Sequence, residues 1–121
     1  MRKIFFYKDR SGKEPVLEYM KELARKEDKD SRIKLNKIND YIEILHCYGT
    51  QAGEPYMKHI EGKLWELRPL RDRILFVGWV GGDYVLLHVF MKKTQKTPTR
   101  EIEKAKRELE DLIERGDFNE S

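Results

Sequence analysis

The sequence predicts one α+β domain spanning residues 1–121, with two helices before an antiparallel sheet and one helix after it. The prediction rests on three observations. Apolar residues recur at helical spacing in three segments, at 15–24, 31–48 and 98–112. Runs rich in β-branched and aromatic residues cluster between the second and third of these segments. The length of 121 residues suits a single domain.

The N-terminal third is predicted to form a strand and a helix pair. Residues 3–8 are aromatic and apolar, which favours a short strand. Pro15 suits the first position of a helix. The polar residues 26–30 indicate a break, after which Asp30 or Ser31 is expected to cap the second helix. Gly49 is expected to end it.

The rest of the chain is predicted to be a three-stranded meander followed by a helix. The expected elements are a loop at 50–55, strands at 63–68, 73–80 and 84–90, a turn at 81–83, a basic loop at 91–97 and a helix capped and opened by Thr97 and Pro98. The tail after Gly116 is expected to fray. The predicted order is therefore β-α-α-β-β-β-α.

Composition excludes several classes of protein. Cys47 is the only cysteine, so a disulfide framework is excluded and a reducing compartment is favoured. One Cys and three scattered His predict no metal cluster. The longest apolar run, residues 74–80, is far shorter than the roughly 20 residues that span a bilayer. We therefore expect a soluble cytoplasmic protein with no membrane association.

Positive charge is concentrated in the segment that is expected to form the sheet. Residues 57–100 hold nine basic and four acidic side chains, whereas residues 101–121 hold four basic and eight acidic ones. Positive charge on one part of a scaffold favours a polyanionic partner. The alternative is a solvated basic face without a ligand.

Cations are expected to meet at one edge of the sheet, which we call the cationic rim: Arg68, Arg73, Lys92 and Lys93, with Lys96 behind them. Arg68 ends one predicted strand, Arg73 begins the next, and the lysines follow the third. In an antiparallel meander these ends lie side by side. Such cations can bind phosphate and stabilise charge that develops in a transition state. Strand-terminal Arg and Lys also occur as ordinary solvated charges.

Two residues of the last predicted strand could add to this chemistry. Strand alternation places His88 and Phe90 on one face and Leu87 and Val89 on the other. Phe90 could stack on an RNA base, and His88 could transfer a proton near neutral pH. A packed core aromatic and a structural histidine are the alternatives. Paired carboxylates spaced for hydrolysis are absent from the sequence, so an enzyme of this sequence is expected to use cations and neither metal nor cofactor.

Several motifs together resemble one known family. They are LWELR at 64–68, RILF at 73–76, VLLHVFMKKT at 85–94, KTP at 96–98 and EIEKA at 101–105. As a run they resemble the HigB-like toxins, the phage-derived branch of the RelE/ParE superfamily of type II toxin–antitoxin systems. The resemblance covers nearly the whole chain.

The resemblance implies a compact RelE-like fold of the microbial-ribonuclease type. It implies a ribosome-dependent mRNA interferase that cleaves mRNA in the A site, without metal, by attack of the ribose 2′-oxygen on the adjacent phosphate. Arg68 matches a functional arginine of the family, Lys93 stands where another arginine lies, and Lys58 and Lys63 match loosely the lysines before the strand. Phe90 is the nearest substitute for the stacking aromatic. Arg68 and Arg73 are then expected to hold the phosphate, and Lys93 or His88 to move the proton.

The resemblance also implies partners and a competing function. The partners would be the 70S ribosome, mRNA and a HigA-like helix-turn-helix antitoxin, with DNA contacted only through the antitoxin complex. The competing function is that of a ParE-like toxin that inhibits DNA gyrase without cutting RNA. A third alternative is a nucleic-acid-binding domain without activity, whose binding would be salt-sensitive.

Overall fold

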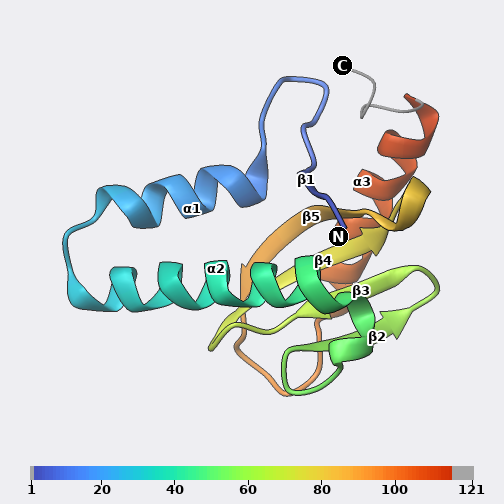
Figure 1. Cartoon of the computed structure of the whole chain (residues 1–121). Coiled ribbons are helices and arrows are strands. Elements are labelled where there is room, and N and C mark those ends of the chain that lie inside the picture. The colour runs from blue at the N-terminus through green and yellow to red at the C-terminus, as the bar shows by residue number, and fades with distance from the viewer. Residues whose placement is uncertain (1, 116–121) are drawn as a thin grey trace.

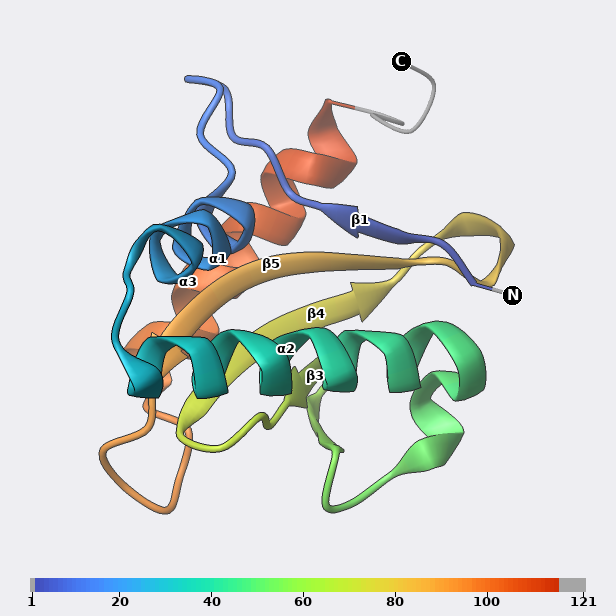
Figure 2. The ribbon, with the colours of Figure 1, turned by 60° about the vertical axis from the view of Figure 1, so that its left-hand side comes forward.

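A five-stranded sheet forms the centre of the molecule, and helices cover both of its faces (Figures 1 and 2). The computed structural model describes residues 2–115. The elements along the chain are β1 (Ile4–Phe6), α1 (Pro15–Arg25), α2 (Lys29–Tyr48), the 3-10 turn η1 (Gly49–Ala52), β2 (Met57–Glu61), β3 (Leu64–Leu67), β4 (Asp72–Gly78), the 3-10 turn η2 (Val80–Gly82), β5 (Tyr84–Met91) and α3 (Thr99–Glu114).

The sheet confirms the predicted α+β class. Its strand order is β1-β5-β4-β3-β2, in which β2 to β5 form an antiparallel meander and β1 pairs with β5 in parallel. The parallel pair is possible because the α1–α2 hairpin and the meander lie between β1 and β5 in sequence. The architecture is compatible with the compact RelE-like fold.

Two hydrophobic clusters lie on opposite faces of the sheet. On one face, α1 and α2 pack Val16 and Ile38 against Phe76. On the other, α3 packs Ala105 and Leu112 against a different set of strand residues. Strand β4 contributes to both clusters because its successive side chains point to opposite faces. Its residues 74–77 are therefore all apolar and buried.

Strand β2 was not predicted; it lies between the predicted loop at 50–55 and the predicted strand at 63–68. Its sequence, MKHIE, contains one fully buried residue, Met57, and is otherwise polar or partly exposed. It is an edge strand with one neighbour, β3, so the apolar pattern that indicates a strand is weak. The meander therefore has four strands instead of three.

Two predicted helix caps are wrong. Asp28, two residues before the expected cap, begins α2 by accepting a hydrogen bond from the Ser31 backbone N–H at 2.9 Å. Pro98 precedes α3 without a side-chain cap, because the Thr97 hydroxyl donates instead to Glu66. Pro15 at the start of α1 and Gly49 at the end of α2 are confirmed. The tail after Gly116 lies outside the described residues.

The predicted alternation along β5 is interrupted by a β-bulge. Leu75 pairs with His88 but Phe76 pairs with Leu86, so Leu87 is the extra residue. Leu87 therefore packs in the α3-side cluster with Val85, although simple alternation places it opposite His88. His88 and Phe90 do share a face, with ring centroids 6.0 Å apart. Val89 lies on the other face, as predicted.

None of the helices within residues 2–115 is both long and apolar enough to traverse a bilayer.

Candidate functional site

The strand register brings the cationic rim together. Leu67 pairs with Ile74, so Arg68 leaves β3 where Arg73 enters β4. Arg73 in turn pairs with Phe90, and the Lys92 N–H donates to the Arg71 carbonyl at 2.7 Å. Three strand ends thus meet at one edge of the sheet.

Glu66 is the buried acid at the centre of the rim. Its side chain is 1% exposed, and its Oε1 accepts from Arg68 Nε at 3.1 Å and lies 3.8 Å from Arg73 Nε. Its Oε2 accepts from the Thr97 hydroxyl at 2.7 Å. One carboxylate therefore holds both arginines and ties the basic loop to β3. A charge this deeply buried persists only when it is paired and hydrogen-bonded.

Arg73 is fixed more firmly than Arg68. Its Nη1 donates to the carbonyls of Leu70 and Asp72, each at 2.8 Å. Leu70 lies in the β3–β4 turn with a positive φ of 58°, and its carbonyl accepts one of these two hydrogen bonds. Burial lowers the pKa of Arg73 while the nearby Glu66 opposes that shift. An arginine nevertheless stays charged at neutral pH.

The rim borders an open hollow of about 430 Å³. Its lining is mainly cationic and polar: Leu70, Arg71, Arg73, Lys92, Lys93, Thr94 and Gln95. Arg68 does not line this hollow; it shares the Glu66 carboxylate with Arg73. Lys93 is exposed, whereas Lys92 is half-buried. A concave surface with several mobile and fixed cations can bind a phosphodiester.

Phe90 lies between the rim and α3. It lines a narrow cleft with Glu66, Arg73 and the 92–98 loop, and it also lines a second open hollow of about 450 Å³. Lys93 lines both of these spaces and the 430 Å³ hollow. The aromatic ring is therefore adjacent to the cations, as predicted.

His88 is buried beneath this surface. Its Nε2 lies 2.6 Å from Glu101 Oε1, and its side chain is 10% exposed. Burial lowers the pKa of His88, and Glu101 only partly offsets that effect. A carboxylate can only accept, so the neutral ring donates through Nε2. His88 thus holds Glu101 in place and does not itself line the hollows described above.

The remaining predicted residues occupy three different places. Lys58 is exposed on β2 and pairs across the sheet with Glu66, so it flanks the rim. Lys96 lies in the basic loop and lines the cleft beside Phe90. Lys63 lies in the β2–β3 turn, at the opposite end of β3 from Arg68, and the structure does not bring it to the rim.

Sequence reasoning gave no role in this site to four of its residues: Glu66, Arg71, Thr97 and Glu101. Arg71 had a signal, since it lies in the four-residue turn between two rim arginines. Glu66 and Glu101 had none, because an acid inside a basic segment gives no indication of which distant partner it binds. Their partners Thr97 and His88 are 31 and 13 residues away in the chain.

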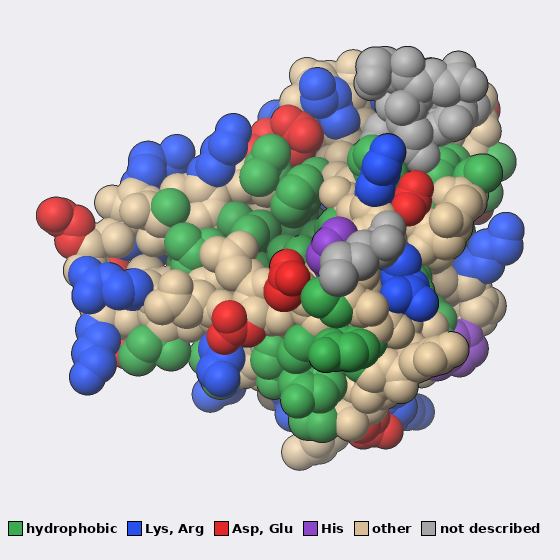
Figure 3. Space-filling model, in the orientation of Figure 1, with side chains coloured by type: hydrophobic (Ala, Val, Ile, Leu, Met, Phe, Trp, Pro, Cys, Tyr) green, Lys and Arg blue, Asp and Glu red, His purple; other side chains and the backbone are tan. Residues whose placement is uncertain are grey.

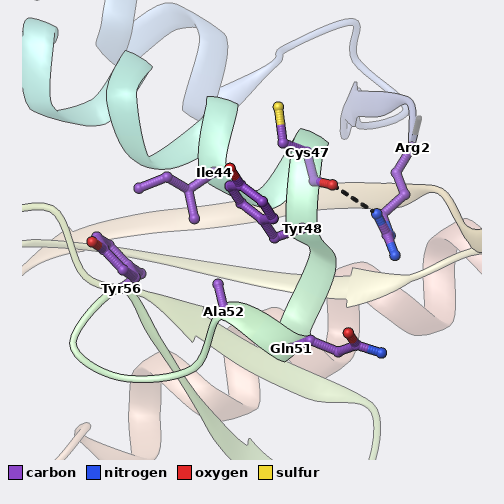
Figure 4. Close-up of a pocket in the computed structure, with 7 residues that line it drawn as sticks. All are labelled: Arg2, Ile44, Cys47, Tyr48, Gln51, Ala52 and Tyr56. Atoms are coloured by element: carbon purple, nitrogen blue, oxygen red, sulfur yellow. Dashed lines mark hydrogen bonds between the residues drawn. The ribbon is translucent and has the colours of Figure 1, made fainter.

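Another hollow, of about 460 Å³, lies on the α2 side of the sheet (Figure 4). Hydrophobic side chains gather over the C-terminal end of α2 and the segment after it (Figure 3). Ile44, Tyr48 and Tyr56 are among the residues that line the hollow. Arg2 borders it and donates to the Cys47 carbonyl at 3.1 Å. Its lining has one cation, so it lacks the chemistry of the rim.

Residues 2–115 contain no group of three His, Cys, Asp or Glu side chains arranged to hold a metal ion.

The sheet and helices are compatible with a compact RelE-like fold, and cations gather at one edge of the sheet. This arrangement is that of a small α+β protein suited to an anionic ligand. Comparison with protein families agrees with this class: the family described as Phage derived protein Gp49-like (DUF891) matches residues 18–110. The chain belongs to this phage-derived family, which is toxin-like and related to RelE and HigB. A search of curated proteins returns no match.

Proposed function

We propose that the protein is the toxin of a type II toxin–antitoxin system, a HigB-like mRNA interferase that cleaves mRNA in the ribosomal A site. Membership of a toxin-like family supports the general role. The observation that carries the proposed activity is the cationic rim, in which Arg73, Lys92 and Lys93 line one hollow and Arg68 shares the Glu66 carboxylate with Arg73. Inhibition of gyrase through protein contacts needs no such cluster.

The proposed reaction is transesterification within the RNA. The ribose 2′-oxygen attacks the adjacent phosphorus and loses its proton, the P–O5′ bond breaks, and the 5′-oxygen takes up a proton. The products are a 2′,3′-cyclic phosphate and a 5′-hydroxyl. Negative charge that builds on the phosphoryl oxygens is stabilised by fixed cations nearby, and Arg73 is the best fixed of them.

Proton transfer is assigned to Lys93 in preference to His88. Lys93 is exposed and lines every space around the rim described above. His88 is buried, and its Nε2 is engaged by Glu101.

The proposed partners follow from this function. The ribosome supplies the A-site mRNA, and a HigA-like helix-turn-helix antitoxin neutralises the toxin in the cytoplasm. The complex would contact DNA through the antitoxin.

A cleavage assay with a defined mRNA tests the proposal. Purified protein is incubated with the RNA with and without programmed ribosomes, and cut sites are mapped by primer extension. EDTA is added only to samples of free RNA because ribosomes require magnesium. We expect cuts only on the ribosome, and loss of cutting in the double variant Arg68→Ala/Lys93→Ala.

Single variants and a matched control sharpen this test. Arg73→Ala should lower the single-turnover cleavage rate about 100-fold, the usual effect of removing one transition-state donor. Arg25→Ala removes an exposed arginine of α1, so its rate should equal that of the wild type. A wild-type rate for Lys93→Ala would refute the assignment to Lys93, and wild-type rates for both Lys93→Ala and His88→Ala would exclude both predicted residues from proton transfer. Absence of cutting by the wild type would refute the nuclease, and a gyrase supercoiling assay would then test the ParE-like alternative.

A further inference from the structure

The 450 Å³ hollow at the end of β5 combines an aromatic wall with a fixed carboxylate. Its lining comprises Phe90, Met91, Lys93, Pro98, Arg100 and Glu101. Phe90 is half-buried, and one face of its ring stacks on His88 with an interplanar angle of 25°. The ring is thereby held in one orientation.

Glu101 presents a hydrogen-bond acceptor to this hollow. Its Oε1 is held by His88 Nε2 at 2.6 Å, which fixes the plane of the carboxylate. Its Oε2 lies 3.6 Å from Arg100 Nε, and the Arg100 side chain is 77% exposed. An ionised carboxylate can only accept hydrogen bonds, so Glu101 favours ligands that present N–H donors.

The hollow shares lining residues with the proposed phosphate site. Lys93 lines both spaces, and Phe90 reaches the narrow cleft that Arg73 and Lys92 border. A nucleotide bound with its phosphate against the cations therefore has its base beside Phe90 and Glu101.

We propose that this hollow binds one base of the RNA, stacked on Phe90 and hydrogen-bonded to Glu101, and that guanine is the preferred base. The proposal rests on the proposed function for its substrate class. Guanine presents N1–H and the N2 amino group side by side, and both can donate to Glu101 Oε2, since Oε1 is engaged by His88. Uracil presents one N–H between two carbonyl oxygens, and the carboxylate repels both of these. Glu101 is thus assigned as a specificity residue and His88 as its positioning residue.

Equilibrium binding tests the pocket without requiring cleavage. Affinities of the wild type for 3′-GMP and 3′-UMP are measured by titration calorimetry. We expect 3′-GMP to bind about tenfold more tightly, which is at the lower end of the discrimination that a good base contact provides. Equal affinities, or binding of neither nucleotide at millimolar concentration, would overturn the proposal.

Glu101→Gln gives the sharper result. The Gln carbonyl must face His88, which donates, so the amide NH₂ faces the hollow and becomes a donor. The preference should then shift toward 3′-UMP, whose carbonyl oxygens accept. Glu110→Gln removes the same charge from an exposed position of α3 and should preserve the preference for 3′-GMP. An unchanged preference in Glu101→Gln would overturn the assignment of Glu101.

Mapping of ribosomal cleavage distinguishes failure of this inference from failure of the proposed function. With mRNAs that place each codon in the A site, the wild type should cut most often where guanine occupies one fixed position relative to the cut. Efficient cutting with no base preference would refute the pocket and leave the nuclease intact. Preferential binding of 3′-GMP without any cutting would refute the nuclease and leave the pocket intact.

Discussion

Replacement of Glu66 by glutamine should destabilise the protein and disorder the cationic rim at the same time. The carboxylate accepts from Arg68 and from Thr97 and is the anion nearest to Arg73 in the contacts described above. The amide keeps the volume but loses the charge. The amide has one carbonyl oxygen and one NH₂ group. Only the carbonyl oxygen can accept from Arg68 or Thr97, so one of these two donors loses its acceptor.

The magnitude follows from the contacts. A hydrogen bond to a charged group contributes roughly 1.5–3 kcal/mol, against about 1 kcal/mol for a neutral one. Two such bonds are weakened or lost, and two largely buried guanidinium groups lose their common counter-ion. Breaking a buried ion pair costs about 3–5 kcal/mol, and partial exposure of Arg68 reduces that figure. We therefore expect a loss of about 2–4 kcal/mol.

Urea unfolding followed by circular dichroism measures this loss. With a slope of about 2 kcal/mol per molar urea, the midpoint should fall by about 1–2 M. Glu54→Gln is the matched control, since Glu54 also approaches Arg68, at 3.8 Å, but is 69% exposed. It should change the free energy of unfolding by less than about 0.5 kcal/mol.

A thermodynamic cycle identifies the route of the effect. The double variant Thr97→Val/Glu66→Gln should lose at least about 1 kcal/mol less free energy of unfolding than the two single variants added together. The reason is that both changes affect the same Thr97–Glu66 hydrogen bond. A loss for Glu66→Gln no larger than that for Glu54→Gln would refute the reasoning that the buried carboxylate supports the rim.

Three further predictions concern stability. Burial raises the pKa of Glu108 to about 7; its stabilising contribution is therefore complete below pH 4.5 and is lost as pH rises through about 7. Glu108→Gln should consequently raise the free energy of unfolding by about 2 kcal/mol at pH 8 and leave it unchanged at pH 4, as measured by urea titration. Hydrogen bonds from Tyr7 and Arg10 and the pairing with Arg115 lower the pKa of Asp111 to about 2, so its contribution is present above pH 3.8 and lost as pH falls through about 2. Asp111→Asn should then cost about 1 kcal/mol at pH 7, with solvent screening included, and progressively less as pH falls through about 2. Phe76 is 0% exposed within the α1–α2-side cluster, and Phe76→Ala should lower the free energy of unfolding by about 3–5 kcal/mol; a loss below 1 kcal/mol would contradict the packing described here.

Hydrophobic periodicity and strand ends were sufficient to predict most of the elements and the location of the rim. The apolar run at 73–80 indicates a strand covered on both faces, and β4 is such a strand. Arg68 and Arg73 could be placed side by side because a four-residue connection between antiparallel strands leaves few alternatives. These inferences depend on local pattern and short connections, which one sequence contains.

The same reasoning did not predict an edge strand or an irregularity in strand register. Strand β2 has one neighbour and mostly exposed or partly exposed side chains, so it lacks an apolar pattern. The bulge at Leu87 follows from how β5 pairs with β4, and the residues of β5 alone give no sign of it.

The sequence by itself determined the fold class, the family and the set of cations, because periodicity, composition and motif order are properties of the chain. Only the tertiary structure decided how those cations are held. Glu66 accepts a hydrogen bond from Thr97 in a distant loop, and Glu101 accepts one from His88 in strand β5. The physical reason is that a buried charge is stable only beside partners that folding brings to it, and the identity of those partners depends on packing between segments far apart in the chain.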